Sequence, residues 1–268
     1  MRIGNREYDL AGKTYIMGIL NITPDSFYEG NRCDAAERAL AKAEKMISEG
    51  ADIIDVGGMS TKPGHSIISG DEEIRRVVPV VREIRKRFAV PLSIDTYRSE
   101  VAEKALDAGA DMVNDIWGGL HPDGRMADII AKYNVPCCLM HNDESDVSSV
   151  EEVLAGLKRS IRYACSRGVD ISKIIIDPGI GFAKDARTNL RVIKELDRFA
   201  DLKLPVLLGA SRKSLIGYAL NLPVEERLEG TLAVTAYALQ KTHIAFFRVH
   251  DVKENARVIK MIAEIVNA

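Results

Sequence analysis

The stretch Asp52-Ile-Ile-Asp-Val-Gly-Gly58 is a short apolar run with a carboxylate near its end, and a helical pattern follows it from Asp71 to Phe88. Seven further runs of the same kind lie along the chain, and a helix-like stretch usually follows. They span Thr14 to Ile22, Leu92 to Thr96, Met112 to Ile116, Pro136 to His141, Lys173 to Gly179, Pro205 to Ser211 and Ala245 to His250. Strand–helix units build a parallel sheet, and eight of them suit a closed (β/α)8 barrel, the TIM barrel of the α/β class.

Polar residues stand at or near the ends of these runs. They are Asn21, Asp55, Asp95, Asn114, His141, Asp177, Lys213, Arg248 and His250. In a barrel of this kind the carboxyl ends of all strands converge on one face. Residues that are far apart in the sequence would therefore meet in one polar cup, and the function is expected there.

Size and composition fit a single domain that spans residues 1 to 268. The length of 268 residues is close to the ~250 typical of this barrel, and no Pro/Ser-rich linker or charge block divides the chain. The net charge of −2, from 37 basic and 39 acidic residues, argues against a nucleic-acid partner. No stretch approaches the ~18 continuous apolar residues of a membrane span, so no membrane association is expected.

The four cysteines, Cys33, Cys137, Cys138 and Cys165, contain no C-x-x-C pair. Two of them lie inside an apolar run, where cysteine most often packs as a small core residue. This pattern favours a reducing compartment, and Met1 to Leu10 contains no apolar signal core, so a cytoplasmic protein is predicted. These first ten residues are interpreted as a short leader that forms a hairpin and closes the bottom of the barrel.

Helical patterns fill most gaps between the runs. They cover Asp34 to Glu49, Asp71 to Phe88, Ser99 to Ala108, Val150 to Arg167, Arg187 to Phe199, Val224 to Gln240 and Val252 to Ala268. Two connections are long, namely Thr23 to Cys33 after the first strand and Met59 to Gly70 after the second. Long loops in a compact barrel are usually functional, so both are interpreted as loops that cover the substrate.

Acidic and amide side chains form the first candidate constellation, which consists of Asp55, Asp95, Asn114, Asp115 and Asp177. Any one of them alone is most simply a cap for a turn or a helix. Three of them, Asp55, Asp95 and Asn114, lie within apolar runs, and burying such a group without partners costs roughly 2–7 kcal/mol. If several of these side chains point into one cavity, they would bind a ligand rich in N–H donors, such as a nitrogen heterocycle. Coordination of a divalent metal is the competing interpretation.

Basic side chains form the second constellation, which consists of Lys62, Arg212, Lys213, Arg248 and His250. The stretch from Gly209 to Ser214 follows the seventh run, and loops after strands seven and eight form the usual phosphate site of this barrel. Arg248 and His250 lie two residues apart in the last run, so they project on the same side. An anionic leaving group or a phosphate is therefore favoured over a solvated helix start.

Several segments resemble the signature motifs of the dihydropteroate synthase family in order and spacing. The first is Gly18-Ile-Leu-Asn-Ile-Thr-Pro-Asp-Ser-Phe27, and the second is Gly50-Ala-Asp-Ile-Ile-Asp-Val-Gly-Gly58 followed by Ser60-Thr-Lys-Pro-Gly64. The others are Ser93-Ile-Asp-Thr96, Asn114-Asp-Ile116, Asp177-Pro-Gly-Ile-Gly-Phe182, Ser211-Arg-Lys-Ser214 and Arg248-Val-His-Asp-Val252. The similarity covers essentially the whole chain, and seven ordered motifs on one barrel are highly specific.

The resemblance implies a transferase of folate biosynthesis. The arylamine of p-aminobenzoate would displace pyrophosphate from the methylene carbon of 6-hydroxymethyl-7,8-dihydropterin pyrophosphate and give 7,8-dihydropteroate. The resemblance also implies Mg²⁺ as cofactor and a homodimer. One alternative is a pterin-binding paralogue with little synthase activity. Another is a corrinoid-linked methyltetrahydrofolate methyltransferase, which has no use for a pyrophosphate site.

The resemblance implies a role for individual residues by position. The catalytic residues would be Asp95, Lys213, Arg248 and His250. The pterin would contact Asp95, Asn114, Ile116, Met140, Asp177, Phe182, Gly209 and Lys213. The p-aminobenzoate would contact Phe27, Thr61, Pro63, Ser211 and Lys213. The pyrophosphate would contact Asn21, Thr61, Arg248 and His250, and Asn21 would also bind Mg²⁺.

The chain departs from the family pattern in two places. The second signature usually reads Gly-Gly-Glu-Ser-Thr-Arg-Pro-Gly, but here Met59 replaces the Glu and Lys62 replaces the Arg. After Met140-His141 the usual segment is replaced by Asn142-Asp143-Glu144. These departures concern the geometry of the second loop and leave the predicted pterin pocket unchanged.

Overall fold

The computed structural model describes residues 1–22, 32–59, 68–121 and 123–268, and it forms a barrel of parallel strands. The strands are β3 (Tyr15–Asn21), β4 (Ile53–Gly57), β5 (Leu92–Asp95), β6 (Met112–Asp115), β7 (Cys137–Met140), β8 (Ile174–Asp177), β9 (Leu207–Leu208) and β10 (Phe246–Val249). They pair in parallel in the order β8-β7-β6-β5-β4-β3-β10-β9. A parallel bridge between Ile176 and Val206 joins the two ends of this sheet, so the predicted eight-stranded barrel is confirmed.

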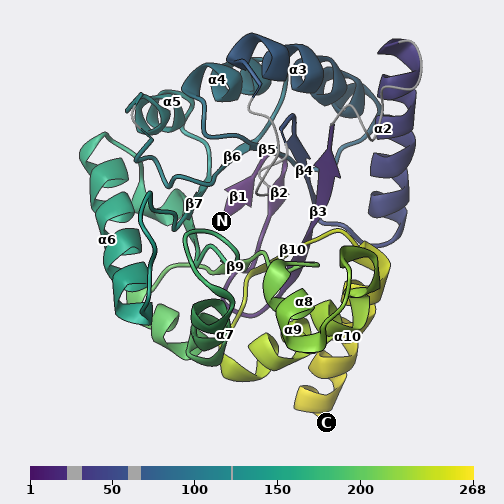
Figure 1. Cartoon of the computed structure of the whole chain (residues 1–268). Coiled ribbons are helices and arrows are strands. Elements are labelled where there is room, and N and C mark those ends of the chain that lie inside the picture. Colours follow the sequence, from purple (N-terminus) through teal and green to yellow (C-terminus); the bar gives the residue numbers. More distant parts are fainter. Residues whose placement is uncertain (23–31, 60–67, 122) are drawn as a thin grey trace.

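Helices form a ring around the barrel (Figure 1). They are α2 (Arg32–Ser48), α3 (Gly70–Arg87), α4 (Ser99–Asp107), α5 (Met126–Tyr133), α6 (Val150–Ser166), α7 (Ala186–Lys194), α8 (Ser214–Leu220), α9 (Leu228–Lys241) and α10 (Val252–Asn267). Serines begin two of the longer ones, because the side chains of Ser69 and Ser149 accept the free backbone N–H of Glu72 in α3 and of Glu152 in α6. Among the described residues, no helix is long and apolar enough to cross a membrane.

The barrel interior has an apolar lower layer and a largely polar upper layer. One inward residue of most strands belongs to a compact apolar cluster, with Met17, Ile53, Met112, Cys138, Ile175, Leu207 and Phe246 as members. Side chains alternate between the two faces of a strand, so the residue two positions later also points inward. In the same strands these residues are Ile19, Asp55, Asn114, Met140, Asp177, Gly209 and Arg248. The strand period thus places Asp55, Asn114, Asp177 and Arg248 at the carboxyl end of the barrel.

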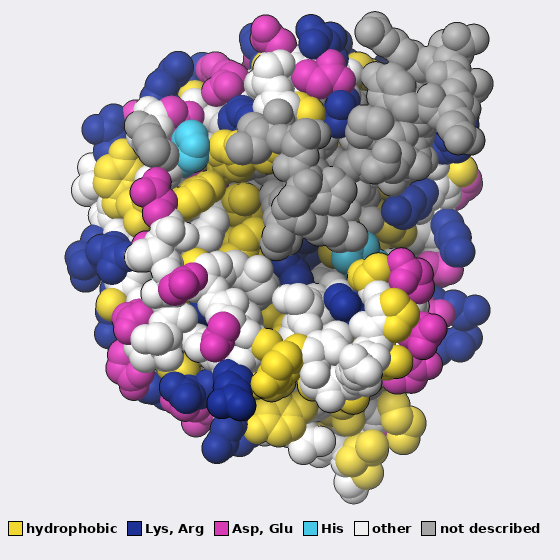
Figure 2. All heavy atoms as spheres, in the orientation of Figure 1, with side chains coloured by type: hydrophobic (Ala, Val, Ile, Leu, Met, Phe, Trp, Pro, Cys, Tyr) yellow, Lys and Arg dark blue, Asp and Glu magenta, His cyan; other side chains and the backbone are white. Residues whose placement is uncertain are grey.

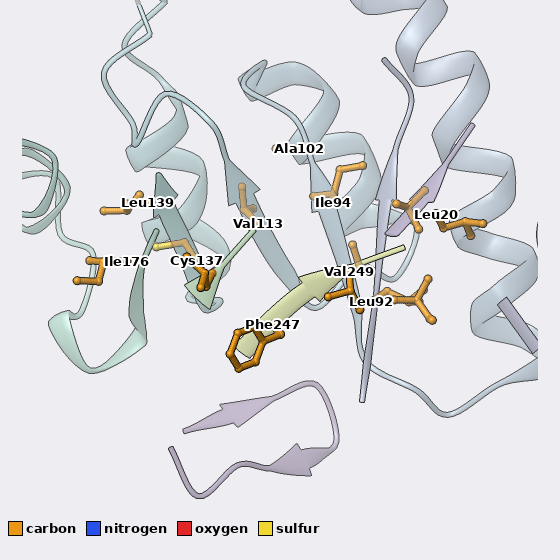
Figure 3. Packing of buried hydrophobic residues seen from close by; sticks show 14 of the residues in the cluster. Leu20, Leu92, Ile94, Ala102, Val113, Cys137, Leu139, Ile176, Phe247 and Val249 are labelled. Atoms are coloured by element: carbon orange, nitrogen blue, oxygen red, sulfur yellow. The ribbon is translucent and has the colours of Figure 1, made fainter. Parts of the chain in front are cut away.

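Outward-facing strand residues pack against the helices and form the larger core. Figure 3 shows part of this cluster, including Ile94 on β5 and Ala102 on α4, which are both fully buried. At roughly 25 cal/mol for each square ångström of apolar surface removed from water, this core supplies most of the stabilisation of the fold.

The N-terminal hairpin closes the lower end of the barrel, as the sequence predicts. It pairs β1 (Arg2–Ile3) with β2 (Arg6–Glu7) in antiparallel fashion, and Figure 3 shows it below the strands in pale purple. Ile3 and Tyr8 are buried in the apolar lower layer. The hydroxyl of Tyr8 donates to the carbonyl of Asp52 over 2.8 Å, which fixes the hairpin to the start of β4.

Three helical features differ from the sequence prediction. The helices α5 and α8 were not predicted, because each has only two turns and α8 contains Gly217 in its middle. The helix predicted from Arg187 ends at Lys194 and continues as the 3-10 helix Leu196–Leu202. The helix predicted from Val224 begins as an α-helix only at Leu228. Most of the two predicted long loops lies at 23–31 and 60–67, outside the described residues, so those loops stay predictions.

Candidate functional site

A largely buried arginine, with 16% of its side chain exposed, lies between two buried carboxylates at the centre of the upper layer. The Nε of Arg248 on β10 donates to Asp55 of β4 over 2.6 Å, and its Nη2 donates to Asp95 of β5. The amide of Asn114 on β6 donates to the same Asp55 oxygen over 3.1 Å. Asp55, Asp95 and Asn114 are all buried. The network joins four strands, and its members come together because β10 pairs with β3, which in turn pairs with β4.

The two carboxylates are only partly satisfied. Within the described part of the chain, Oδ1 of Asp55 and Oδ1 of Asp95 are buried and accept no hydrogen bond. Burial raises the pKa of Asp95 to about 7, although the neighbouring Arg248 opposes this shift. The carboxylates of Asp95 and Asp55 raise the pKa of Arg248 against its desolvation, so the guanidinium is charged at every physiological pH. An unpaired carboxylate oxygen at such a site is suited to meet a ligand that carries N–H donors or positive charge.

Asp177 forms the second acidic point of the cup, at the end of β8. Its Oδ1 accepts the backbone N–H of Gly179 over 2.7 Å, which sets the orientation of the carboxyl group. Burial raises the pKa of Asp177, and the N–H of Gly179 opposes this. A Cβ atom added to Gly209 would lie 3.5 Å from the other oxygen, so the absence of a side chain there leaves space beside the carboxylate. The predicted slot residues Ile116 and Met140 are both buried.

Lys213, which directly precedes α8, lies against Phe182, which follows β8. The ammonium group of Lys213 is 4.2 Å from the centre of the Phe182 ring, a cation–π arrangement that fixes the position of the charge. The turn that carries Lys213 is held by Arg212, which has a φ of +55° and donates from Nε and Nη2 to the two oxygens of Asp251, each over 2.8 Å. Arg212 therefore supports the turn and is not part of the basic group that the sequence predicted.

His250 and Ser211 form a hydrogen-bonded pair above β9 and β10. The backbone N–H of His250 donates to Oγ of Ser211 over 3.2 Å, and the same hydroxyl lies 3.0 Å from Nδ1 of the His250 ring. When the Ser211 hydroxyl donates to Nδ1, the neutral ring carries its proton on Nε2, which can then donate to an anion.

Asn21 lies at the end of β3, close to the acidic residues. A Cβ atom added to Gly57 would be 3.4 Å from the amide oxygen of Asn21 and 3.5 Å from Oδ2 of Asp95, so both oxygens face the same small space. Hard oxygen donors of this kind suit Mg²⁺. No group of three His, Cys, Asp or Glu side chains converges on a metal position in the described ranges. A cation here would take its remaining ligands from substrate oxygens and water.

The predicted residues converge on one face wherever the structure describes them. Figure 2 shows this face with a hollow near its centre, in which basic side chains are visible. The positions that the resemblance assigned to p-aminobenzoate and pyrophosphate at Phe27, Thr61 and Pro63 fall outside the described residues, as does Lys62. Their roles stay predictions.

Lys184 is a charged residue near the cup that the sequence did not indicate. Its ammonium group lies 3.2 Å from Nδ1 of the buried His141. Burial lowers the pKa of Lys184 to about 8, and burial together with the charge of Lys184 lowers the pKa of His141 to about 4. His141 is therefore neutral, and its ring packs so closely on α6 that a Cβ atom at Gly156 would overlap it. Its role is structural.

The buried His141 predicts a loss of stability in acid. Its pKa of about 4 lies below the ordinary value of 6.5, so the unfolded chain binds the proton more readily between these values. The free energy of unfolding should therefore fall as the pH drops from about 6.5 to about 4, by about 3 kcal/mol from this residue. In His141→Asn, whose amide oxygen can still accept from Lys184, this part of the pH dependence should be missing. Urea denaturation at several pH values measures it, and an equal slope in both proteins contradicts it.

Comparison with known proteins places this site in a family. Residues 17–250 match the model of the family described as pterin binding enzyme. The chain is 52% identical to the dihydropteroate synthase of Clostridium beijerinckii, over 99% of each chain. It is 48% identical to that of Bacillus subtilis, over 95% of this chain and 90% of the relative.

Solved structures agree with the sequence comparison. Dihydropteroate synthase from Clostridium difficile, crystallised in the presence of pteroic acid, has a TM-score of 0.93 and 44% identity, covering 98% of this chain and 100% of that one. The Xanthomonas albilineans dihydropteroate synthase with 4-aminobenzoic acid has a TM-score of 0.90 and 36% identity, covering 96% and 94%.

The chain therefore belongs to the pterin binding enzyme family. Within that family its function is that of the dihydropteroate synthases. It is a transferase that condenses 6-hydroxymethyl-7,8-dihydropterin pyrophosphate with p-aminobenzoate and releases pyrophosphate.

Proposed function

We propose that the upper layer of the barrel performs this condensation with Asp95, Asn114, Asp177 and Lys213 as the pterin site. The observation that carries the proposal is that these residues come from separate strand ends and face one cup. Asp177 accepts hydrogen bonds from the donor edge of the pterin, and its orientation is already set by Gly179. Lys213 donates to an acceptor of the ring, and Phe182 beneath its ammonium group holds it in place. Ile116, Met140 and Gly209 would line the faces of the flat pterin ring.

Asp95 has a further role in the reaction. Positive charge develops on the pterin methylene carbon as the bond to pyrophosphate breaks, and a preorganised carboxylate nearby stabilises that charge. The Oδ1 atom of Asp95, which accepts no hydrogen bond in the described part of the chain, is the atom proposed for this role. Arg248 opposes the rise in the pKa of Asp95 and holds the carboxyl group in position through Nη2. The arylamine is neutral at pH 7, so its attack needs no strong general base.

The departing pyrophosphate is bound by Asn21, His250 and Arg248 in this proposal. His250 donates from Nε2, because Ser211 occupies Nδ1. Arg248 adds positive charge below the anion, although it also forms ion pairs with Asp55 and Asp95. Asn21 would hold Mg²⁺, which when bound neutralises charge on the pyrophosphate oxygens. The p-aminobenzoate would lie against Ser211 and Lys213, together with the predicted contacts from Phe27, Thr61 and Pro63.

A direct assay tests the proposed function. Purified protein is incubated with the pterin pyrophosphate, p-aminobenzoate and Mg²⁺, and dihydropteroate and pyrophosphate are both quantified. Equal amounts of the two products are expected, and omission of Mg²⁺ should lower the rate strongly. Protein that binds the pterin but releases neither product would instead be the paralogue with little synthase activity.

We also propose that the enzyme is a homodimer that works in the cytoplasm. The support for a dimer is that six large apolar side chains are exposed on the adjoining helices α8, α9 and α10 (Figure 1). This group, called the apolar patch, consists of Tyr218, Leu220, Tyr237, Met261, Ile265 and Val266, with exposed fractions from 39% to 75%. Contiguous exposed apolar surface commonly marks a protein interface. The support for the cytoplasm is that Cys137, Cys138 and Cys165 are free thiols.

A double substitution tests the dimer. Tyr218→Glu with Met261→Glu places two charges in the patch. The free energy needed to bury these charges in an interface would exceed the free energy that the apolar contact contributes. Sedimentation equilibrium should give twice the chain mass for the natural protein and the single chain mass for the variant. A dimeric variant would contradict the assignment of the interface to this patch.

A further inference from the structure

A second buried ion pair lies behind the site, between α3 and the end of β5. The carboxylate of Glu73 is almost fully buried, with 1% of its side chain exposed, and it accepts from Nη1 of Arg98. Burial raises the pKa of Glu73, while hydrogen bonds from Thr96 and Arg98 lower it. Thr96 directly follows Asp95 in the sequence. The pair therefore adjoins the strand end that carries the carboxylate proposed to act on the pterin.

Arg98 also touches both described ends of the connection after β4. Its Nη2 donates to the carbonyl of Ile68 over 2.7 Å. Its Nη1 lies 4.0 Å from the sulfur of Met59, on the other side of residues 60–67. One guanidinium thus bridges two points that are nine positions apart in the sequence, and the planar fork of arginine makes this possible.

The start of the connection packs directly on the same carboxylate side chain. A Cβ atom added to Gly58 would lie 2.9 Å from Cγ of Glu73 and 2.7 Å from Cγ1 of Val77, so only glycine fits. The carbonyl of Gly58 also accepts from Nη1 of Arg76 over 3.3 Å. Any shift of the Glu73 side chain would therefore move the chain where it leaves β4.

Stability alone does not account for this arrangement. Taking two charges out of water is costly, and buried ion pairs can often be replaced by apolar side chains without loss of stability. Here the pair fixes the relative positions of three backbone segments. They are Thr96 just after β5, Gly58 just after β4 and the carbonyl of Ile68 before α3.

We propose that Glu73 and Arg98 are positioning residues of the synthase, which hold the described ends of the connection after β4 in register with the end of β5. The inference rests on the proposed function of the site. Neither residue contacts the reacting groups in this proposal. The pair acts on the second substrate, because the connection that it holds leads into the motif that the family resemblance assigns to p-aminobenzoate.

Arg98→Lys is the decisive variant, because lysine keeps the charge that pairs with Glu73 but lacks the second arm that reaches Ile68. The variant should fold, with a thermal midpoint close to that of the natural protein. Its KM for p-aminobenzoate should rise about three- to tenfold, as expected for one lost hydrogen bond of ordinary net strength, while kcat and the KM for the pterin pyrophosphate change less than twofold. Arg98→Met should raise the same KM further.

Arg85→Lys is the matched control, because Arg85 makes the same kind of contacts at the opposite end of the barrel. It pairs with Asp111 and donates to the carbonyls of Gly109 and Val90. This control should change only the thermal midpoint. The proposal is overturned if Arg98→Lys folds but leaves the KM for p-aminobenzoate at the natural value, whether or not its thermal midpoint falls as that of Arg85→Lys does. If the natural protein itself makes no dihydropteroate, the proposed function fails instead.

Discussion

Arg248→Met is expected to lower the free energy of unfolding by about 3–5 kcal/mol, which is the cost typical of removing one partner from a buried ion pair. The variant leaves Asp55 and Asp95 buried side by side without the guanidinium that now pairs with both. Each carboxylate already has one oxygen that accepts no hydrogen bond in the described part of the chain. The variant should therefore take up protons on folding and regain part of its stability in mild acid.

Denaturant unfolding at pH 7.5 and at pH 5.5 measures this effect. Arg75→Met is a suitable control, because the Arg75 side chain is 56% exposed and forms only a surface pair with Glu72, so a change within about 0.5 kcal/mol is expected. Combining Arg248→Met with Asp55→Asn should recover part of the loss, because one of the two unpaired charges is gone. If Arg248→Met alone unfolds at the same denaturant concentration as the natural protein, the network does not carry the stability assigned to it.

Lys213→Ala is expected to reduce kcat/KM by a factor of about ten to one hundred or more while the fold stays intact. The substitution removes a positioned charge-assisted hydrogen bond in the catalytic pocket, worth roughly 1.5–3 kcal/mol. The ammonium group stands over the Phe182 ring, and Lys213 is the residue in the proposal that contacts both the pterin and p-aminobenzoate.

Steady-state kinetics with both substrates varied measure this loss, and circular dichroism reports whether the variant is folded. Lys253→Ala on the exposed side of α10 is the matched control and should leave all kinetic constants unchanged. If folded Lys213→Ala were as active as the natural protein, Lys213 would not belong to the site.

Much of the fold and of the site could be predicted because strand periodicity is local. Asp55 lies two positions after Ile53, and Asp177 lies two positions after Ile175, so both must point into the barrel once the apolar residues do. The same rule places Arg248 above Phe246. The hairpin at the lower end was also predicted and is confirmed.

The contacts between these side chains could not be predicted in the same way. Arg248 pairs with Asp55, which is 193 positions away in the sequence, and that pairing depends on how the sheet closes. The same holds for Lys184 beside His141 and for Arg98 beneath Met59. Met59 stands where the family signature has an acidic residue. The neighbouring Arg98 nevertheless has a carboxylate partner, because it pairs with Glu73.

The two-layer interior divides the barrel into a part that holds the fold together and a part that can be varied. The apolar layer and the hairpin beneath it make no contact with the proposed substrate positions, so they can keep the scaffold folded while the upper positions change. Directed-evolution libraries aimed at new heterocyclic substrates should thus be confined to the positions two residues above this layer. There, exchanging all members of a buried charge pair for neutral groups of similar size can relieve the scaffold of a desolvation cost while it alters which ring is accepted.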